Sequence, residues 1–198
     1  GRCAEIAASG LLRGARGNSG VITSLLFRGF SKYMKEKVTA DGLDFACALT
    51  NGVEAAYKAV MKPAEGTILT VSRVSAETAT EACAETTDIE NILDVAIVSA
   101  RAALAETVNQ NPVLTKAGVI DAGGQGFVYI LEAMRSAMLG EPVEALEVQE
   151  EKKAEEPVYV DMSNFTFTYD TVFIVRKGEN CDLEAYGLYL NSIGDSLV

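Results

Sequence analysis

The sequence predicts a mainly α-helical protein, an antiparallel bundle of several helices followed by the start of a small α+β domain. Of the 198 residues, 48% are hydrophobic but only 7% are aromatic, which indicates an alanine-rich helical core. Apolar residues recur at helical spacing over most of residues 1–140. After an acidic stretch the pattern changes to the β-branched and aromatic residues that are typical of strands.

A glycine-rich corner, Gly-Ala-Arg-Gly-Asn-Ser-Gly over residues 14–20, separates the first two predicted helices, residues 3–13 and 21–37. Its glycines let a ligand approach the backbone closely, and its asparagine or serine can cap the second helix. A helix that begins with free N–H groups and a positive dipole end attracts phosphate. The alternative is that the corner only stops one helix and starts the next. The candidate phosphate-binding residues are Gly17, Asn18, Ser19 and Gly20.

The third helix is predicted to begin after Asp41, a suitable N-cap, and to end at Pro63. The fourth begins at a second glycine-bearing corner, Gly66 and Thr67, and runs to Cys83. Four serines and threonines at positions 67 to 75 are unusually dense for a helix interior, where their hydroxyls compete for backbone hydrogen bonds. We expect them to face either a binding site or solvent.

The fifth helix has the clearest apolar stripe and is predicted from Asp88, its N-cap, to Asn109. Asn-Pro at residues 111–112 breaks it. A last helix runs to Gly140 from a third corner, which contributes the candidate residues Asp121, Ala122 and Gly123. In an antiparallel array, alternate corners can meet at one rim and form a binding site there.

The net charge of −11 argues against nucleic acid or an anionic membrane as partner, because binding either takes clustered Lys and Arg. A single nucleotide is compatible, since backbone N–H groups and Mg²⁺ neutralise its phosphates locally. The sequence contains no histidine, which removes the commonest general base. Phosphoryl transfer to a carboxylate needs none, because the acceptor is already an anion and positioning supplies most of the rate.

The four cysteines stand far apart and form no Cys-x-x-Cys pair, so we expect reduced core residues. Neither a signal peptide nor a long apolar run is present, which favours a cytoplasmic location. The chain starts within a helical pattern without methionine and stops at an apolar run. We therefore expect an N-terminally truncated fragment that is inactive by itself.

Three domain segments are predicted. Residues 1–140 form the helical domain. Residues 141–157 carry seven glutamates and two lysines and form an acidic linker. Residues 158–198 begin an α+β middle domain, with strand patterns over 159–175 and a helix over 182–193. A unit of this size has too small a core to fold well without more chain or a partner.

Residues 14–21, 62–71 and 117–127 resemble, in order, three signatures of the DhaL (Dak2) domain of dihydroxyacetone kinases and fatty acid kinases. The residues of these three segments are most similar to those of the ATP-binding subunit of fatty acid kinase. The resemblance implies a DhaL-like helical barrel that binds ATP with Mg²⁺ and phosphorylates a fatty acid held by a DegV-like binding protein. It also assigns roles to the candidate residues: Gly17, Asn18, Ser19 and Gly20 wrap the phosphates, Gly66 and Thr67 line the nucleotide, and Asp121, Ala122 and Gly123 close the ribose or adenine side.

The resemblance leaves several points open. The family's metal ligands lie in an aspartate-rich motif expected upstream of Gly1, so no metal ligand and no catalytic residue is assigned. A dihydroxyacetone (glycerone) kinase-like phosphotransferase is a second hypothesis, although residues 111–118 offer only Lys116 in place of that family's arginine. A non-catalytic nucleotide-binding scaffold and a helical interaction module are further hypotheses. Homodimer formation is also left open.

Overall fold

The computed structural model describes residues 2–60, 62–141, 171 and 182–194. The chain divides into two compact units, Gly1–Val143 and Glu144–Leu197, and each is described by itself. The predicted strands over 159–175 and nearly all of the predicted linker lie outside the described residues. The domain boundaries at 140 and 157 therefore stay predictions.

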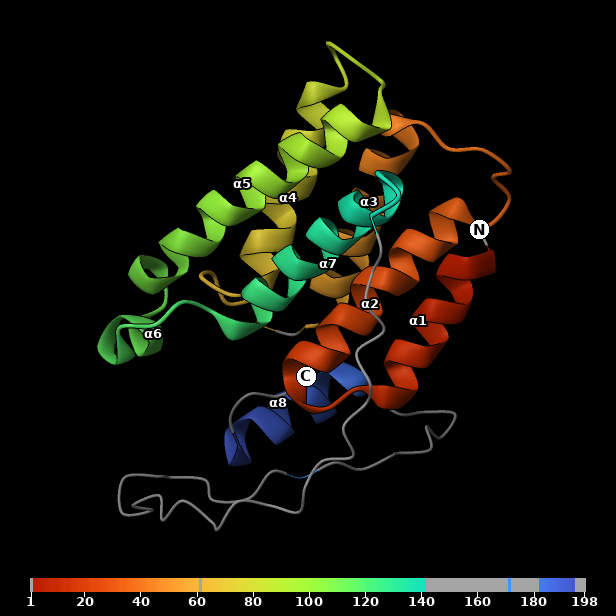
Figure 1. Cartoon of the computed structure of the whole chain (residues 1–198). Helices are drawn as coiled ribbons and strands as arrows, with labels where there is room; N and C mark the ends of the chain where they lie inside the picture. The colour runs from red at the N-terminus through yellow and green to blue at the C-terminus, as the bar shows by residue number, and fades with distance from the viewer. Residues whose placement is uncertain (1, 61, 142–170, 172–181, 195–198) are drawn as a thin grey trace, which may run out of the picture. The chain divides into compact units, whose positions relative to one another are not determined.

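The described residues confirm the mainly α-helical fold (Figure 1). α8 (Leu183–Ile193) belongs to the second unit and lies where the sequence predicted a helix. One element, α6, was not predicted: Pro112 does break the preceding helix, but it also occupies the first position of a new one, where proline is well tolerated. The helices of the first unit are α1 (Arg2–Gly14), α2 (Gly17–Met34), α3 (Gly42–Ala59), α4 (Ile68–Ala82), α5 (Ile89–Gln110), α6 (Pro112–Ala117) and α7 (Ala122–Met138).

Aspartates cap three of these helices, and for Asp41 and Asp88 this confirms the prediction. The carboxylate of Asp41 accepts a hydrogen bond from the Asp44 N–H, and Asp88 and Asp121 do the same for α5 and α7. The prediction for α2 is wrong. Its N-cap is Arg16, and Asn18 and Ser19 lie inside the first turn. The chain enters this helix at Gly17, whose φ of 62° is readily adopted only by glycine, so the helix starts before either predicted cap.

Glycines let α2 and α3 pack with their backbones in direct contact. A Cβ added to Gly52 of α3 would lie 2.5 Å from the carbonyl oxygen of Leu26, and one added to Gly29 of α2 would overlap the carbonyl oxygen of Asn51. The neighbouring core is rich in fully buried alanines on α3, α4 and α5, which keep those helices close as well. This confirms the alanine-rich helical core.

The hydroxyl groups of α4 do not follow the prediction. Thr70, Ser72 and Ser75 are all buried, facing neither solvent nor an open site. Ser75 Oγ donates to the carbonyl oxygen of Ala96 on α5 at 3.1 Å, and Ser72 Oγ donates to Leu69 in its own helix. A buried hydroxyl with a partner carries little penalty, so the core accepts these side chains.

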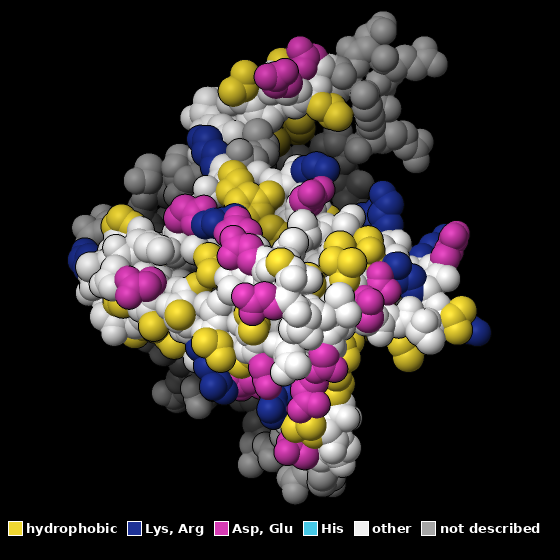
Figure 2. Space-filling model, turned by 90° about the horizontal axis from the view of Figure 1, so that it is seen from above, with side chains coloured by type: hydrophobic (Ala, Val, Ile, Leu, Met, Phe, Trp, Pro, Cys, Tyr) yellow, Lys and Arg dark blue, Asp and Glu magenta, His cyan; other side chains and the backbone are white. Residues whose placement is uncertain are grey.

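Surface features of the described residues add two findings. Acidic side chains are scattered over the face seen in Figure 2, with apolar side chains between them. No described helix combines the length and the apolar character that crossing a membrane would take. Cys3, Cys47 and Cys83 are free thiols. Cys83 is half-buried and packs against the core, and Cys47 is half-buried, whereas Cys3 is exposed, so the prediction of a core residue is wrong for Cys3. Cys181 lies outside the described residues.

Candidate functional site

The three glycine-bearing corners lie at one end of the first unit, where α2, α4 and α7 begin (Figure 1). Ser19 touches the third corner, since a Cβ added to Gly123 would stand 2.8 Å from Ser19 Oγ. Gly124 faces α4, because a Cβ there would stand 2.9 Å from Val71 Cγ2. The N-terminal turns of the three helices thus converge at one rim, as the antiparallel arrangement predicted.

At the first corner, the start of α2 lacks a side-chain cap. Each of the helices α3 to α8 has a side-chain oxygen that accepts from a backbone N–H in its first turn, whereas Arg16 supplies none to α2. Gly17, Asn18 and Ser19 are exposed and Gly20 is half-buried. The first N–H groups of α2 are therefore directed at the surface and available to an anion.

At the second corner, Gly66 is held by protein contacts. Its φ is 74°, it is buried, and a Cβ there would stand 2.8 Å from the backbone nitrogen of Asn111. Its N–H donates to Thr70 Oγ1 at 2.9 Å. Thr67 is half-buried; its hydroxyl donates to the Ala64 carbonyl at 2.8 Å and accepts from the Leu69 N–H at 3.3 Å. The requirement for glycine at position 66 is thus explained by packing.

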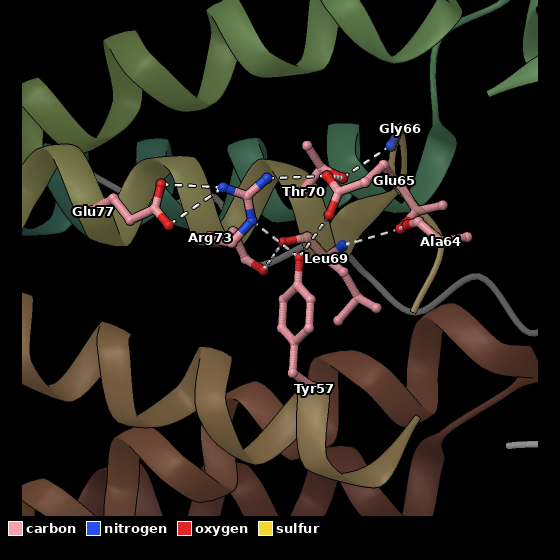
Figure 3. A network of polar contacts seen from close by, with 10 residues as sticks. Tyr57, Ala64, Glu65, Gly66, Leu69, Thr70, Arg73 and Glu77 are labelled. Carbon is pink, nitrogen blue, oxygen red and sulfur yellow. Dashed lines mark hydrogen bonds and ion pairs between the residues drawn. The ribbon is translucent and has the colours of Figure 1, made fainter. Parts of the chain in front are cut away.

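A polar network fixes the loop that leads into this corner (Figure 3). Glu65 accepts hydrogen bonds from the Thr70 hydroxyl at 2.8 Å and from Arg73 Nη2 at 3.0 Å. Arg73 also donates to the hydroxyl of Tyr57 at 3.2 Å and to the carboxylate of Glu77 at 3.2 Å. Residues of α3, the loop and α4 are joined in this way, so the position of Gly66 relative to α4 is well determined.

The contacts of the network also shift the pKa values of its side chains. The Thr70 hydroxyl, together with Arg73, holds the pKa of Glu65 below its ordinary value. The hydrogen bonds that Arg73 donates to the Tyr57 hydroxyl and to the two carboxylates raise the pKa of Arg73, and burial raises the pKa of Tyr57. Glu65 is therefore a stable anion and Arg73 a stable cation at neutral pH, which suits a positioning role rather than proton transfer.

Sequence reasoning missed this network as a functional element. Glu65 lies within the second signature, and the density of serines and threonines after it was a usable signal. The sequence did not show which way these hydroxyl groups point. The hydroxyl of Thr70 bonds to Glu65 and Gly66 and does not point outward.

At the third corner, Asp121 is half-buried and its Oδ2 accepts from the Gly124 N–H at 2.6 Å. Its own N–H donates to the hydroxyl of Thr107, a fully buried residue near the end of α5. Gly123 is half-buried and Ala122 is exposed. The corner is thereby anchored to α5, and sequence reasoning did not identify the part that Thr107 plays.

The described residues differ in how well they suit the two expected ligands. An uncapped helix start beside a second helix N-terminus fits the phosphates of a nucleotide. For Mg²⁺, no group of three or more His, Cys, Asp or Glu side chains within the described part of the chain could hold a metal ion.

Comparison with known proteins shows matches over most of the chain. Residues 1–136 match the family model described as the DAK2 domain. Protein YloV of Bacillus subtilis is 46% identical over 143 residues, which cover 72% of this chain and 26% of YloV. An uncharacterized protein of Staphylococcus saprophyticus is 37% identical over 207 residues, and one of Staphylococcus aureus strain USA300 is 38% identical over 209; each match covers 100% of this chain and 38% of the relative. The chain thus spans well under half the length of these relatives.

Proposed function

Because the chain belongs to the DAK2 domain family, we propose that it is the nucleotide-binding part of an ATP-dependent kinase whose acceptor is a fatty acid carboxylate. The observation that carries this proposal is the contact between Ser19 and Gly123, which joins the uncapped start of α2 to the start of α7. Two helix N-termini at one rim provide positive dipole ends and backbone donors for a polyphosphate.

In this proposal, the exposed turn formed by Gly17, Asn18, Ser19 and Gly20 binds the phosphates. Thr67 lies at the start of α4, where it lines the nucleotide, and Gly66 shapes that start through its own packing. Asp121, Ala122 and Gly123 close the ribose side. One carboxylate oxygen of Asp121 caps α7, which leaves the other to accept from a ribose hydroxyl.

The choice of acceptor rests on chemistry. None of the 198 residues is histidine, and Glu65 and Arg73 of the described network are held in their charged forms. A carboxylate acceptor needs no general base, whereas the hydroxyl of dihydroxyacetone is normally deprotonated as it attacks. The acid would be presented by a DegV-like fatty-acid-binding protein, and Mg²⁺ would be held by residues outside the described part. We place this reaction in the cytoplasm.

The test uses the longest form of the protein that its gene encodes. The protein is incubated with Mg·ATP and a fatty-acid-loaded DegV-like protein, and hydroxylamine traps the acyl phosphate as a hydroxamate. We expect hydroxamate that depends on both proteins. Turnover with dihydroxyacetone and no hydroxamate would reverse the assignment of the acceptor. ATP binding measured by calorimetry without turnover of either acceptor would instead support a nucleotide-binding scaffold.

A further inference from the structure

A groove of about 340 Å³ runs between α1 and α2, which lie side by side in the first unit (Figure 1). Ala8, Leu12 and Leu25, here called the apolar floor, are the apolar residues that line it. Ala8 is buried and Leu25 half-buried, whereas Leu12 is 56% exposed, so the floor is open to solvent mainly at Leu12. A cavity of this size with an apolar base is large enough to take up a ligand or several side chains of another protein.

One edge of the groove is strongly cationic. Arg28, Lys32 and Lys35 line it and are all exposed; we call them the basic row. Within the described part of the chain, none of the three makes an ion pair or a side-chain hydrogen bond, whereas the exposed cations Lys58 of α3 and Arg101 of α5 are each paired with a glutamate. Among the described residues, Glu5 is the single carboxylate that lines the groove.

The basic row is unusual for its setting. Like charges three or four residues apart on a helix repel each other, and the chain carries a net charge of −11 that could have supplied partners. The row follows one face of α2 and its C-cap residue Lys35, which has a helical backbone, over about 10 Å, given the rise of an α-helix. A single phosphate or carboxylate would neutralise one cation and leave the apolar floor in water.

We propose that this groove is a docking site for an amphipathic helix of a protein partner, with an apolar stripe on the floor and carboxylates facing the basic row. A helix placed in the groove between two packed helices buries its stripe as in other helix-in-groove complexes. Its carboxylates at positions i, i+4 and i+7 match the spacing of the three cations along α2. The proposal goes beyond phosphoryl transfer and does not depend on it.

The experiment measures binding of a labelled synthetic helical peptide by fluorescence anisotropy. The peptide carries a leucine stripe flanked by glutamates at i, i+4 and i+7, and a second peptide has the same composition in scrambled order. We expect the first peptide to bind more tightly, and the affinity to fall as salt is added. The double variant K32E/K35E should bind it about tenfold more weakly.

Two controls make the result specific. The variant K58E/R101E has the same change in net charge at exposed positions of α3 and α5, outside the groove, and we expect an affinity within about twofold of the unchanged protein. A peptide with lysines in place of the glutamates should bind K32E/K35E better than the unchanged protein, which shows that the variant is folded.

Three results would overturn the proposal. The first is equal binding of the scrambled peptide, and the second is no binding of either peptide at millimolar concentration. The third is displacement of the peptide by inorganic phosphate at equal concentration, which would identify a small-anion site instead.

Discussion

The hydroxyl oxygen of Ser19 on α2 occupies the space into which a side chain at position 123 of α7 would project: a Cβ on Gly123 would stand 2.8 Å from Ser19 Oγ and 3.3 Å from Ser19 Cβ. Two corners that are far apart in the sequence are thus in contact only because one of them lacks a side chain. The contact ties the geometry of the candidate nucleotide site to the packing of α2 on α7.

The first prediction concerns this contact. Gly123→Ala should lower the free energy of unfolding by about 1 kcal/mol and weaken ATP binding, because the new methyl group pushes Ser19 away. Ser19→Ala in the same protein should recover part of the stability by removing Oγ. Urea unfolding measures both effects. The control is Gly126→Ala on the same helix, where no atom lies within 4 Å and no loss is expected.

The second prediction separates backbone strain from ligand binding. Gly17 and Gly118 both have left-handed φ angles, 62° and 67°, and a Cβ at either would meet no atom within 4 Å. Alanine at either position should therefore cost about 1 kcal/mol of stability from the backbone alone. Calorimetry should show weaker ATP binding for Gly17→Ala only. Equal affinities of the two variants would remove the first corner from the nucleotide site.

The third prediction concerns the packing of α2 on α3. Gly29→Ala or Gly52→Ala should each lower the free energy of unfolding by about 3 kcal/mol, because the added methyl group meets the backbone of the facing helix and neither backbone can move aside cheaply. The matched control is Gly10→Ala on α1, where a Cβ meets nothing within 4 Å. That change should stabilise the protein by about 0.5 kcal/mol through helix propensity.

The fourth prediction is a pH dependence. Hydrogen bonds from Thr70 and then from Arg73 lower the pKa of Glu65 in the folded protein below its ordinary value of 4.5. The stabilising contribution is therefore complete above that value and is lost as the pH falls through the lower, folded pKa. Glu65→Gln should make the loss of stability on acidification below pH 4.5 shallower in urea titrations. Glu54→Gln, which removes an exposed partner of Lys58, is the control and should leave the slope unchanged.

The sequence by itself determined the helices and where most of them begin. Asp41 and Asp88 were predicted as N-caps, and each does accept from the N–H three residues later. This interaction spans a single turn, so it depends on neighbouring residues that the sequence shows directly. The candidate corners were found for the same reason, since a glycine between two helical patterns is a local signal.

Only the tertiary structure decided how the site is built. Ser75 bonds to Ala96 of α5, Glu65 is held by Arg73 from the second turn of α4, and Ser19 meets Gly123. Each of these contacts joins two side chains or a side chain and a backbone atom that come close only when the helices pack. The residues next to a side chain in the sequence do not determine in which direction that side chain points. The structure also showed that α2 has no side-chain cap, because the helix starts at Gly17, ahead of Asn18 and Ser19, and the N–H groups of its first turn have no side-chain partner.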